Sequence, residues 1–340
     1  MLKITKIAKG ILGLALTTAA STAMAQESLR IGDSFPVGHY ISENLTKFWM
    51  EEVTRMSDGG ITFEYFPAQQ MGKVKDLLSL TQTGVLDIGY VAPAYVADKM
   101  PLSAVGELPE GFSTSCEGTK AYWEIAKPGN ILDQAEIAQA GMRLLMVMVL
   151  PPYQIYTGDR AIEGLASFEG MKLRATGGAM EITARKLGAV PVQMPAPEVR
   201  EAISRGTLDA VLFPASSLLP YEIVPHLKEA TKGMNFASFV VTYMISQKKW
   251  DALSPENQKI LSEAGEAATM HGCEIADQLN TTDKKTIADG GVKFVDFSAE
   301  DTTKINALLA KVGSEWADGL EAQGKPARKI LDAFRNALPK

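Results

Sequence analysis

The sequence predicts an α/β protein of two lobes, each with a central β-sheet flanked by helices. Three observations lead to this expectation: apolar patterns that alternate between strand and helix periods, a supersecondary unit that occurs twice, and a length of 340 residues, which suits about two domains. A hydrophobic content of 46% is ordinary for a globular fold.

The first copy of the repeated unit lies near the N-terminus. Apolar patterns predict strands over 29–32 and 61–66, with a helix between them that opens at Ser42. Strand, helix and strand in this order form a βαβ unit, which favours a parallel sheet. A further helix over 74–83 leads into an almost wholly apolar strand over 85–91.

The second copy repeats this order of elements. Strands are predicted over 171–175 and 190–193, with a helix over 179–187 between them. A helix opening at Pro197, where a missing N–H is tolerated, leads into a strand over 207–213.

The two copies also share a sequence where the second helix passes into its strand. Thr-Gly-Val-Leu-Asp at 83–87 corresponds to Arg-Gly-Thr-Leu-Asp at 205–209, and a proline follows each strand, at Pro93 and Pro214. A helix, a glycine cap and a strand are common in α/β proteins, but their repetition in a chain of this size suggests two similar lobes that close by a hinge motion.

The last third of the chain predicts one strand and several helices. Residues 236–246 form a strand returning between the lobes, and Ser254 with Pro255 opens a long helix that runs to about residue 280. Two shorter helices are expected at 299–323 and 326–337.

These elements suggest boundaries for the parts of the chain. After a signal peptide at 1–25, we expect lobe I to comprise 26–150 with about 237–275. Lobe II then comprises 151–236 with about 276–340.

The N-terminus has the layout of a cleaved secretory signal. Lys3, Lys6 and Lys9 precede the apolar run 11–20, and Ala23-Met24-Ala25 offers a cleavage site for small residues. The apolar run is shorter than the roughly 20 residues that a membrane span needs. We therefore expect a soluble protein that is secreted through the inner membrane into the periplasm.

Charge and the scarcity of reactive motifs exclude several classes of function. Without residues 1–25, which contain three lysines and no acid, the net charge falls from −6 to −9. An acidic chain without basic runs argues against a nucleic-acid partner. The sequence also lacks a Gly-x-Ser-x-Gly turn, a paired-histidine metal motif and a Walker-type loop, so we expect no enzyme activity and no cofactor.

Cys116 and Cys273 are the two cysteines of the chain and form a candidate disulfide in an oxidising compartment, with two free thiols as the alternative. The three histidines, His39, His226 and His271, are scattered. A structural zinc ion wants about four ligands, so we expect no metal site.

Several segments resemble the solute-binding subunits of tripartite ATP-independent periplasmic (TRAP) transporters. The similar segments are spread over most of the mature chain: 67–72, 84–88, 168–174, 187–192, Glu198, 206–209 and 250–257. The resemblance implies a type II periplasmic-binding-protein fold with hinge strands and a long helix spanning both lobes. It also implies delivery of a small-molecule carboxylate to the membrane subunits of a sodium-coupled TRAP permease.

The resemblance also implies that Arg174, in the Gly-x-Lys-x-Arg stretch, binds the ligand carboxylate. The residues themselves agree, since Arg174 ends a strand and ligands of α/β sheets lie beyond the carboxyl ends of strands. A guanidinium group can bind both carboxylate oxygens at once.

One departure from the family pattern bears on the ligand. Many members carry an asparagine before the proline that here is Pro214, and this chain has Phe213 instead. We therefore expect a monocarboxylate with an aromatic or apolar body. The alternatives are a C4-dicarboxylate or a 2-oxo acid in the same system.

Further candidates for ligand contact are aromatic or polar residues near the predicted strand ends. They are Phe35, Tyr40, Tyr95, Tyr153, Gln154 and Phe236. Each is individually more often a core residue than a ligand contact. The binding subunit of an ATP-driven importer is the main competing function, since it has the same two-lobed shape.

Overall fold

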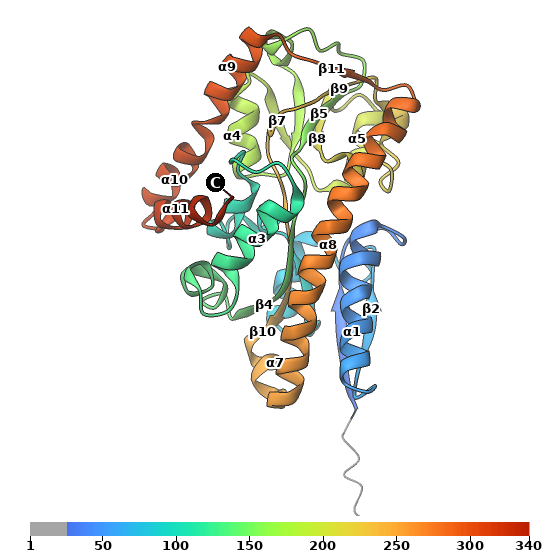
Figure 1. The fold of residues 1–340 in the computed structure, drawn as a ribbon, viewed down its shortest axis with the longest axis vertical. Coiled ribbons are helices and arrows are strands. Elements are labelled where there is room, and N and C mark those ends of the chain that lie inside the picture. The colour runs from blue at the N-terminus through green and yellow to red at the C-terminus, as the bar shows by residue number, and fades with distance from the viewer. Residues whose placement is uncertain (1–25, 340) are drawn as a thin grey trace, which may run out of the picture.

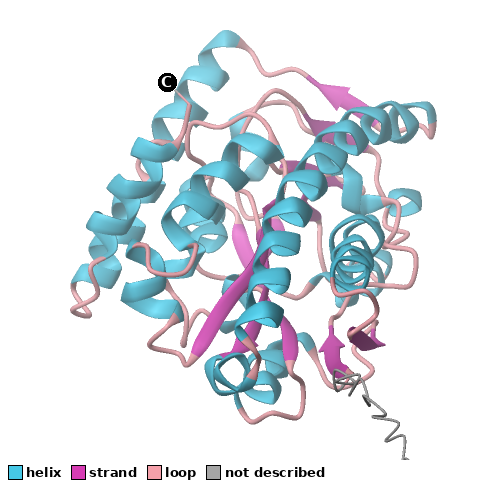
Figure 2. Cartoon of the chain, turned by 60° about the horizontal axis from the view of Figure 1, so that its bottom comes forward, coloured by secondary structure: helices cyan, strands magenta, loops and turns pink. Residues whose placement is uncertain are grey.

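The structure, a computed structural model, describes residues 26–339, so the predicted signal peptide lies outside the described residues. Two separate β-sheets form the centres of two lobes, and helices cover their faces (Figures 1 and 2). This agrees with the fold class predicted from the sequence. None of the helices in the described residues is both long and apolar enough to cross a bilayer.

The first sheet has five strands in the order β2-β1-β3-β10-β4. β1 pairs in parallel with β2 and β3, whereas β10 is antiparallel to β3 and β4. The strands are β1 (Glu27–Gly32), β2 (Ile61–Phe66), β3 (Ile88–Val91), β4 (Met142–Val149) and β10 (Val240–Ser246).

The second sheet has six strands in the order β11-β9-β5-β8-β6-β7. β6 pairs in parallel with β7 and β8, and β5 is antiparallel to β8 and β9. The strands are β5 (Gln154–Thr157), β6 (Lys172–Ala175), β7 (Val190–Gln193), β8 (Ala210–Phe213), β9 (Glu229–Thr231) and β11 (Lys293–Val295). Three parallel strands followed by an antiparallel one therefore occur in both sheets, as the repeated sequence unit suggested.

The helices that flank the sheets are mostly short. They are α1 (Phe48–Met56), α2 (Leu77–Gln82), α3 (Ser115–Ala126), α4 (Ala179–Lys186), α5 (Val199–Ser204), α6 (Ala215–Leu218), α7 (Gln247–Ala252), α8 (Pro255–Asp289), α9 (Ala299–Leu309), α10 (Val312–Glu321) and α11 (Ala327–Ala337). Shorter helical turns include η3 (Pro93–Val96) and η4 (Leu102–Glu107).

Helix α8 is longer than predicted and runs past both sheets, from α7 at one end of the molecule to the neighbourhood of α5 at the other (Figure 1). It begins where expected, because Ser254 Oγ accepts a hydrogen bond from Asn257 N and Pro255 occupies the first helical turn. Along its length it packs against β4, α1, α3 and α6. A disulfide between Cys116 and Cys273 joins it to α3.

Several sequence predictions of element boundaries were wrong, and the strand expected over 236–246 begins only at Val240. The strands expected from 85 and 207 begin later, because the N–H groups of Val85 and Leu86 both donate to Leu80 O, and the equivalent residues 207 and 208 donate to Ala202 O. These hydrogen bonds close the helix end before the strand can start. The helix expected over 299–323 is divided into α9 and α10.

Two chain segments connect the lobes and lie side by side. β4 leads into β5 through 150–153, and β9 leads back to β10 through 232–239. The first segment donates from Leu150 N to Phe239 O and from Tyr153 N to Ala237 O, both at 2.8 Å. These paired crossings form a two-stranded hinge.

The lobe boundaries predicted above remain a prediction. Helix α11 lies within the range predicted for lobe II, but it contacts α3 and η4, which lie within the range predicted for lobe I. Phe334 of α11 meets Phe112 edge to face, with ring centres 6.3 Å apart.

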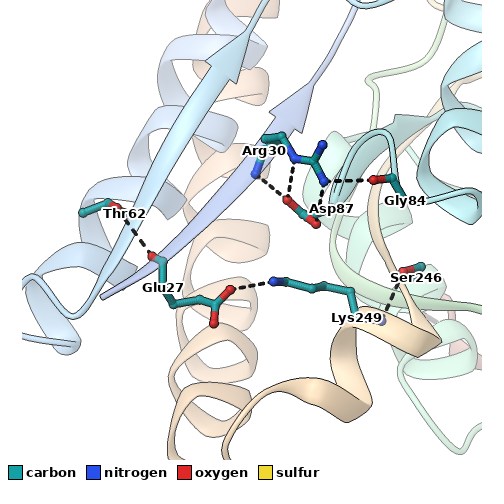
Figure 3. A network of polar contacts seen from close by, with 7 residues as sticks. All are labelled: Glu27, Arg30, Thr62, Gly84, Asp87, Ser246 and Lys249. Carbon is teal, nitrogen blue, oxygen red and sulfur yellow. Dashed lines mark hydrogen bonds and ion pairs between the residues drawn. The ribbon is translucent and has the colours of Figure 1, made fainter. Parts of the chain in front are cut away.

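Matching ion pairs hold the two parallel units together. In the first unit, Asp87 accepts hydrogen bonds from Arg30 N and Arg30 Nε, while Arg30 Nη2 donates to Gly84 O (Figure 3). In the second unit, Asp209 accepts from Lys172 N, and Lys172 Nζ donates to Gly206 O. The two lobes are thus built on the same local arrangement of strand, glycine and aspartate.

Candidate functional site

Arg174 lies on β6, one residue before its carboxyl end, and is 1% exposed. Its Nε donates to Met194 O and its Nη1 to Leu212 O, both at 3.0 Å, and its Nη2 donates to Tyr95 Oη at 3.3 Å. No ion pair within residues 26–339 involves Arg174. A buried guanidinium group held by neutral oxygens is left with its positive charge uncompensated.

Aromatic rings surround the guanidinium group on the second-lobe side. Its central carbon lies 4.5 Å from the centre of the Phe213 ring, which is a cation–π distance. Phe213 in turn stacks on Tyr153, with ring centres 6.2 Å apart, and meets Tyr221 edge to face at 6.1 Å. Phe213, which occupies the position where many family members have asparagine, therefore lies directly against Arg174.

Tyr95, on η3 of the first lobe, joins the two lobes at this point. Its Oη accepts hydrogen bonds from Arg174 Nη2 and from Ala196 N, the latter at 3.0 Å. Both donors belong to the second lobe. The hydroxyl proton of Tyr95 is therefore left to donate to a further group.

The turn after Arg174 also packs closely against the first lobe. Gly177 has a φ of +119°, and a Cβ placed there would lie 2.6 Å from Gln193 Nε2 and 3.2 Å from Ala94 O. A side chain at this position would be strained and would push the lobes apart. Glycine therefore lets the start of α4 approach η3.

The loop after β1 supplies the first-lobe side of the site. Phe35 packs against Tyr90 and His39, with ring centres 4.7 and 4.9 Å apart. His39 stacks on Tyr40 at 4.9 Å and meets Tyr221 of the second lobe at 5.1 Å. The hydroxyl of Tyr40 accepts from Ser216 Oγ at 3.2 Å, which adds a further hydrogen bond between the lobes.

These residues form what we call the interlobe cluster. Its members are Phe35, His39, Tyr40, Tyr90, Tyr95, Tyr153, Arg174, Phe213 and Tyr221.

Asp33 anchors the loop that carries Phe35 and His39. Its carboxylate accepts hydrogen bonds from Tyr65 Oη at 2.6 Å, from Tyr243 Oη at 2.8 Å and from Phe35 N at 3.1 Å. Burial raises the pKa of Asp33 to about 6, although these hydrogen bonds oppose the shift. The aromatic loop is therefore fixed by a polar group behind it.

Glu107 and His39 are two more of the titratable groups buried in the first lobe. Burial raises the pKa of Glu107, at the end of η4, to about 8, and hydrogen bonding to Ala94 N opposes this shift. Glu107 Oε2 and His39 Nε2 are buried and have no hydrogen-bond partner in the described part of the chain. Burial also lowers the pKa of His39 to about 3, so His39 is neutral at neutral pH.

The structure brings together most of the residues predicted from the sequence. Arg174, Phe213, Tyr153 and Tyr95 meet directly, and Phe35 and Tyr40 lie across from them.

Gln154 and Phe236 are engaged elsewhere. Gln154 Nε2 donates to Met234 O and its Oε1 accepts from Thr231 Oγ1, and Phe236 packs edge to face on Phe168. Gln154 instead lines a separate pocket with Asn235 and Asn280. These contacts do not support a ligand role for either residue.

Sequence reasoning missed His39, Glu107 and Tyr221. In the sequence His39 is one of three scattered histidines, although it follows β1 and precedes Tyr40, a predicted ligand contact. Glu107 is an isolated acid in the apolar stretch 102–108, a position where burial perturbs a carboxyl group. An ionisable residue within such a stretch was the available signal.

The chemistry of the interlobe cluster suits an organic anion. It offers one buried cation, hydroxyl groups and aromatic faces from both lobes. Within the described residues, no three His, Cys, Asp or Glu side chains gather as metal ligands.

Comparison with known families identifies one that covers most of the chain. The family described as bacterial extracellular solute-binding protein, family 7 (DctP) matches residues 31–318. A solute-binding protein of Roseobacter denitrificans is 26% identical over 323 residues, covering 90% of this chain and 95% of that protein. The ectoine-binding periplasmic protein TeaA of Halomonas elongata is 23% identical and covers 82% of this chain and 81% of its own.

Solved structures share the fold. A TRAP solute-binding protein from Rhodoferax ferrireducens, in complex with copurified benzoate, superposes with a TM-score of 0.83 at 22% identity, over 91% of this chain and 97% of that one. A TRAP periplasmic solute-binding protein from Bordetella bronchiseptica, with bound (R)- and (S)-mandelate, gives 0.82 at 23% identity, over 91% and 98%.

Proposed function

Because the chain belongs to bacterial extracellular solute-binding protein family 7, the substrate-binding subunits of TRAP transporters, we propose that it captures a small monocarboxylate with an aromatic or apolar body. The family consists of bacterial extracellular proteins that bind a solute, which supports a periplasmic location. Delivery to a sodium-coupled TRAP permease, after cleavage of residues 1–25, completes the proposal.

The observation that carries this proposal is the buried charge of Arg174, which has no carboxylate partner in the described chain. A guanidinium group has five N–H donors, and three are engaged by Met194 O, Leu212 O and Tyr95 Oη. Since Nε is occupied, the remaining donors are one on each terminal nitrogen. A ligand carboxylate can therefore accept from the free N–H of Nη1, of Nη2 or of both, and neutralise the charge.

The body of the ligand would lie against rings. Phe213 covers one face of the guanidinium group, and Tyr153, Tyr221 and Tyr90 extend the aromatic surface. The benzoate and mandelate complexes of the similar proteins agree with such a ligand, since both are aromatic monocarboxylates. Phe213 offers no hydrogen bond to a second carboxylate, which disfavours a C4-dicarboxylate.

Capture requires that the ligand bind both lobes. Arg174 and Phe213 belong to the second lobe and Tyr95 to the first, so a carboxylate between them would contact both. A ligand shifts the balance between open and closed forms only by its different affinity for the two. The hydroxyl proton of Tyr95 supplies such a difference, because it reaches the carboxylate only after closure.

Calorimetry on refolded, ligand-free protein tests the proposal. Benzoate, phenylacetate and mandelate should bind, and succinate and malate should bind weakly or not at all. Arg174→Ala should weaken binding by about 2–5 kcal/mol, or roughly 30- to 5,000-fold. Lys172→Ala, an exposed position two residues earlier on the same strand, is the matched control and should leave affinity unchanged.

Two results would refute the proposal. Tight binding of succinate with no response to aromatic acids would refute the ligand class, and normal affinity of Arg174→Ala would place the anion elsewhere. Mass spectrometry of the ligand after prolonged incubation separates binding from catalysis, since a transport protein returns it unchanged.

A further inference from the structure

His39 lies at the junction of the lobes and has one nitrogen that the protein does not use. Its ring is enclosed by Phe35, Tyr40 and Tyr221, and the residue is 1% exposed. Nδ1 accepts a hydrogen bond from Ile41 N at 3.2 Å, whereas Nε2 has no partner in residues 26–339. A buried polar atom of this kind generally has a partner in the working state of a protein.

The hydrogen bond from Ile41 decides which nitrogen carries the proton. Nδ1 can accept from a backbone N–H only through its lone pair, so the proton of the neutral ring resides on Nε2. Burial, which lowers the pKa of His39, keeps the ring neutral. The free nitrogen is therefore a hydrogen-bond donor.

Aromatic contacts link His39 to the anion site. His39 meets Tyr221, Tyr221 meets Phe213, and Phe213 covers Arg174, each step spanning 4.5–6.1 Å. The hydroxyl of Tyr40, whose ring stacks on His39, already accepts a hydrogen bond from Ser216 Oγ. The Nε2–H donor of His39 therefore belongs to the same interlobe cluster as Arg174, at the opposite end of this series of contacts.

We infer that the ligand carries a neutral hydrogen-bond acceptor, such as a hydroxyl, ether or carbonyl oxygen, away from its carboxylate, and that this atom binds His39 Nε2–H. The inference rests on the proposed function and narrows its ligand class to oxygen-substituted aromatic or cyclic acids. A ligand with an ammonium group in that place is disfavoured, because it would meet an N–H donor. His39 then selects ligands that carry an acceptor oxygen, and Arg174 selects ligands that carry a negative charge.

Matched ligand pairs test the inference. The probes are 3- and 4-hydroxybenzoate and the methyl analogues of each, which are similar in size but lack the oxygen. Wild type should bind the preferred hydroxyl compound at least about tenfold more tightly than its methyl partner, since a buried donor left unpaired costs about this much.

Two substitutions assign the preference to the correct nitrogen. His39→Asn places a carbonyl oxygen near the position of Nδ1, so it keeps the bond from Ile41 N and removes the donor at Nε2. His39→Gln reaches the position of Nε2 with an amide N–H. The hydroxyl-to-methyl affinity ratio should fall to about one in His39→Asn and recover in His39→Gln.

The outcomes separate this inference from the proposed function. Equal binding of both members by wild type, with loss of both in Arg174→Ala, overturns the inference alone. Failure of wild type to bind any of the four acids overturns the inference together with the aromatic ligand class. If a variant does not fold, as judged by thermal unfolding, nitrogen NMR on wild-type His39 decides: the Nε2 resonance should shift with the hydroxyl compound and not with the methyl one.

Discussion

The repeated units of the two lobes are alike at one end of their strands and different at the other. In the first, Arg30 donates to Asp87 and to Gly84 O and so joins β1 to the turn before β3. In the second, Lys172 donates to Asp209 and to Gly206 O in the same way. Gly84 and Gly206 have φ angles of +79° and +68°, so each turn needs glycine.

Two residues after Arg30 on β1 and after Lys172 on β6, the two units differ. The first unit has Gly32, where an added Cβ would lie 2.8 Å from Leu86 Cδ1, so the core fills this space. The second unit has Arg174, whose guanidinium group reaches the interlobe cluster. The networks of Arg30 and Lys172, which the two units share, stabilise the fold, whereas Arg174, which the first unit lacks, contributes to the candidate site.

The lobes also divide the buried charges between them. The first lobe contains the acids Asp33 and Glu107, with pKa values raised to about 6 and about 8 by burial, and the second contributes the cation Arg174. An acid nearer to Arg174 would compete with the ligand for the guanidinium group. Glu107 is close enough to Arg174 for their charges to interact, but its raised pKa keeps it mostly neutral at pH 7, so the cation stays available to a ligand.

The shared network gives the largest expected change in stability. Asp87→Ala should lower the free energy of unfolding by about 2–3 kcal/mol, because it leaves Arg30 N and the guanidinium group without their acceptor. Asp209→Ala should cost less, about 1–2 kcal/mol, since its side chain is 23% exposed against 10% for Asp87.

Urea unfolding of both variants without ligand measures this difference, and ligand affinity should stay within about twofold of wild type. A loss of affinity as large as that of Arg174→Ala would contradict the separation of scaffold and site.

Glu107→Gln should have a smaller effect that depends on pH. A carboxyl group with a raised pKa in the folded protein stabilises it fully below the unfolded pKa and loses that contribution as pH rises through the folded value. Wild type should therefore lose about 1–2 kcal/mol between pH 7 and pH 9, and Glu107→Gln should not.

The pKa of Asp33 is lower, about 6, so Asp33 is already ionised between pH 7 and pH 9. A change in stability over this interval therefore reports the titration of Glu107. Unfolding of wild type and variant at both pH values gives the comparison, with the exposed Glu256→Gln as a control that should follow wild type. Parallel loss of stability in wild type and Glu107→Gln would assign the titration to another group.

The fold could be predicted from the sequence because local patterns decide it. β2 and β7 have the predicted bounds, 61–66 and 190–193, since strand periods and flanking glycines mark them. The start of β3 could not be predicted, because apolar Val85 and Leu86 resemble a strand while their N–H groups complete a helix end. A hydrophobic pattern does not show where backbone hydrogen bonds go.

The site was less predictable because it joins residues far apart in the chain. Arg174 was selected through the family resemblance, but nothing local shows that Tyr95 would accept its hydrogen bond or that His39 would meet Tyr221. The position of Gln154 after the apolar run 144–150 predicts a ligand contact, but its amide is satisfied by Met234 and Thr231. Contacts across a hinge depend on how the lobes close, which strand and helix periods do not encode.

Tyr95→Phe gives the smallest expected effect and tests how the first lobe recognises the second. The change removes the acceptor for Arg174 Nη2 and Ala196 N together with the hydroxyl proton proposed for the ligand carboxylate, and it keeps the ring packed on Phe239, 5.2 Å away. In the open form these N–H groups are free to bond with water, so only the closed form is penalised, by about 1 kcal/mol. Ligand affinity should fall roughly fivefold, through faster dissociation.

Stopped-flow fluorescence with an aromatic acid measures the dissociation rate, and small-angle scattering measures how much loaded protein is closed. Tyr122→Phe is the matched control, because its hydroxyl donates to Ser103 O inside the first lobe and should not affect closure. Unchanged dissociation in Tyr95→Phe would mean that Arg174 and Phe213 hold the ligand without the first lobe, and the two lobes would then contribute to binding even more unequally than their strand ends suggest.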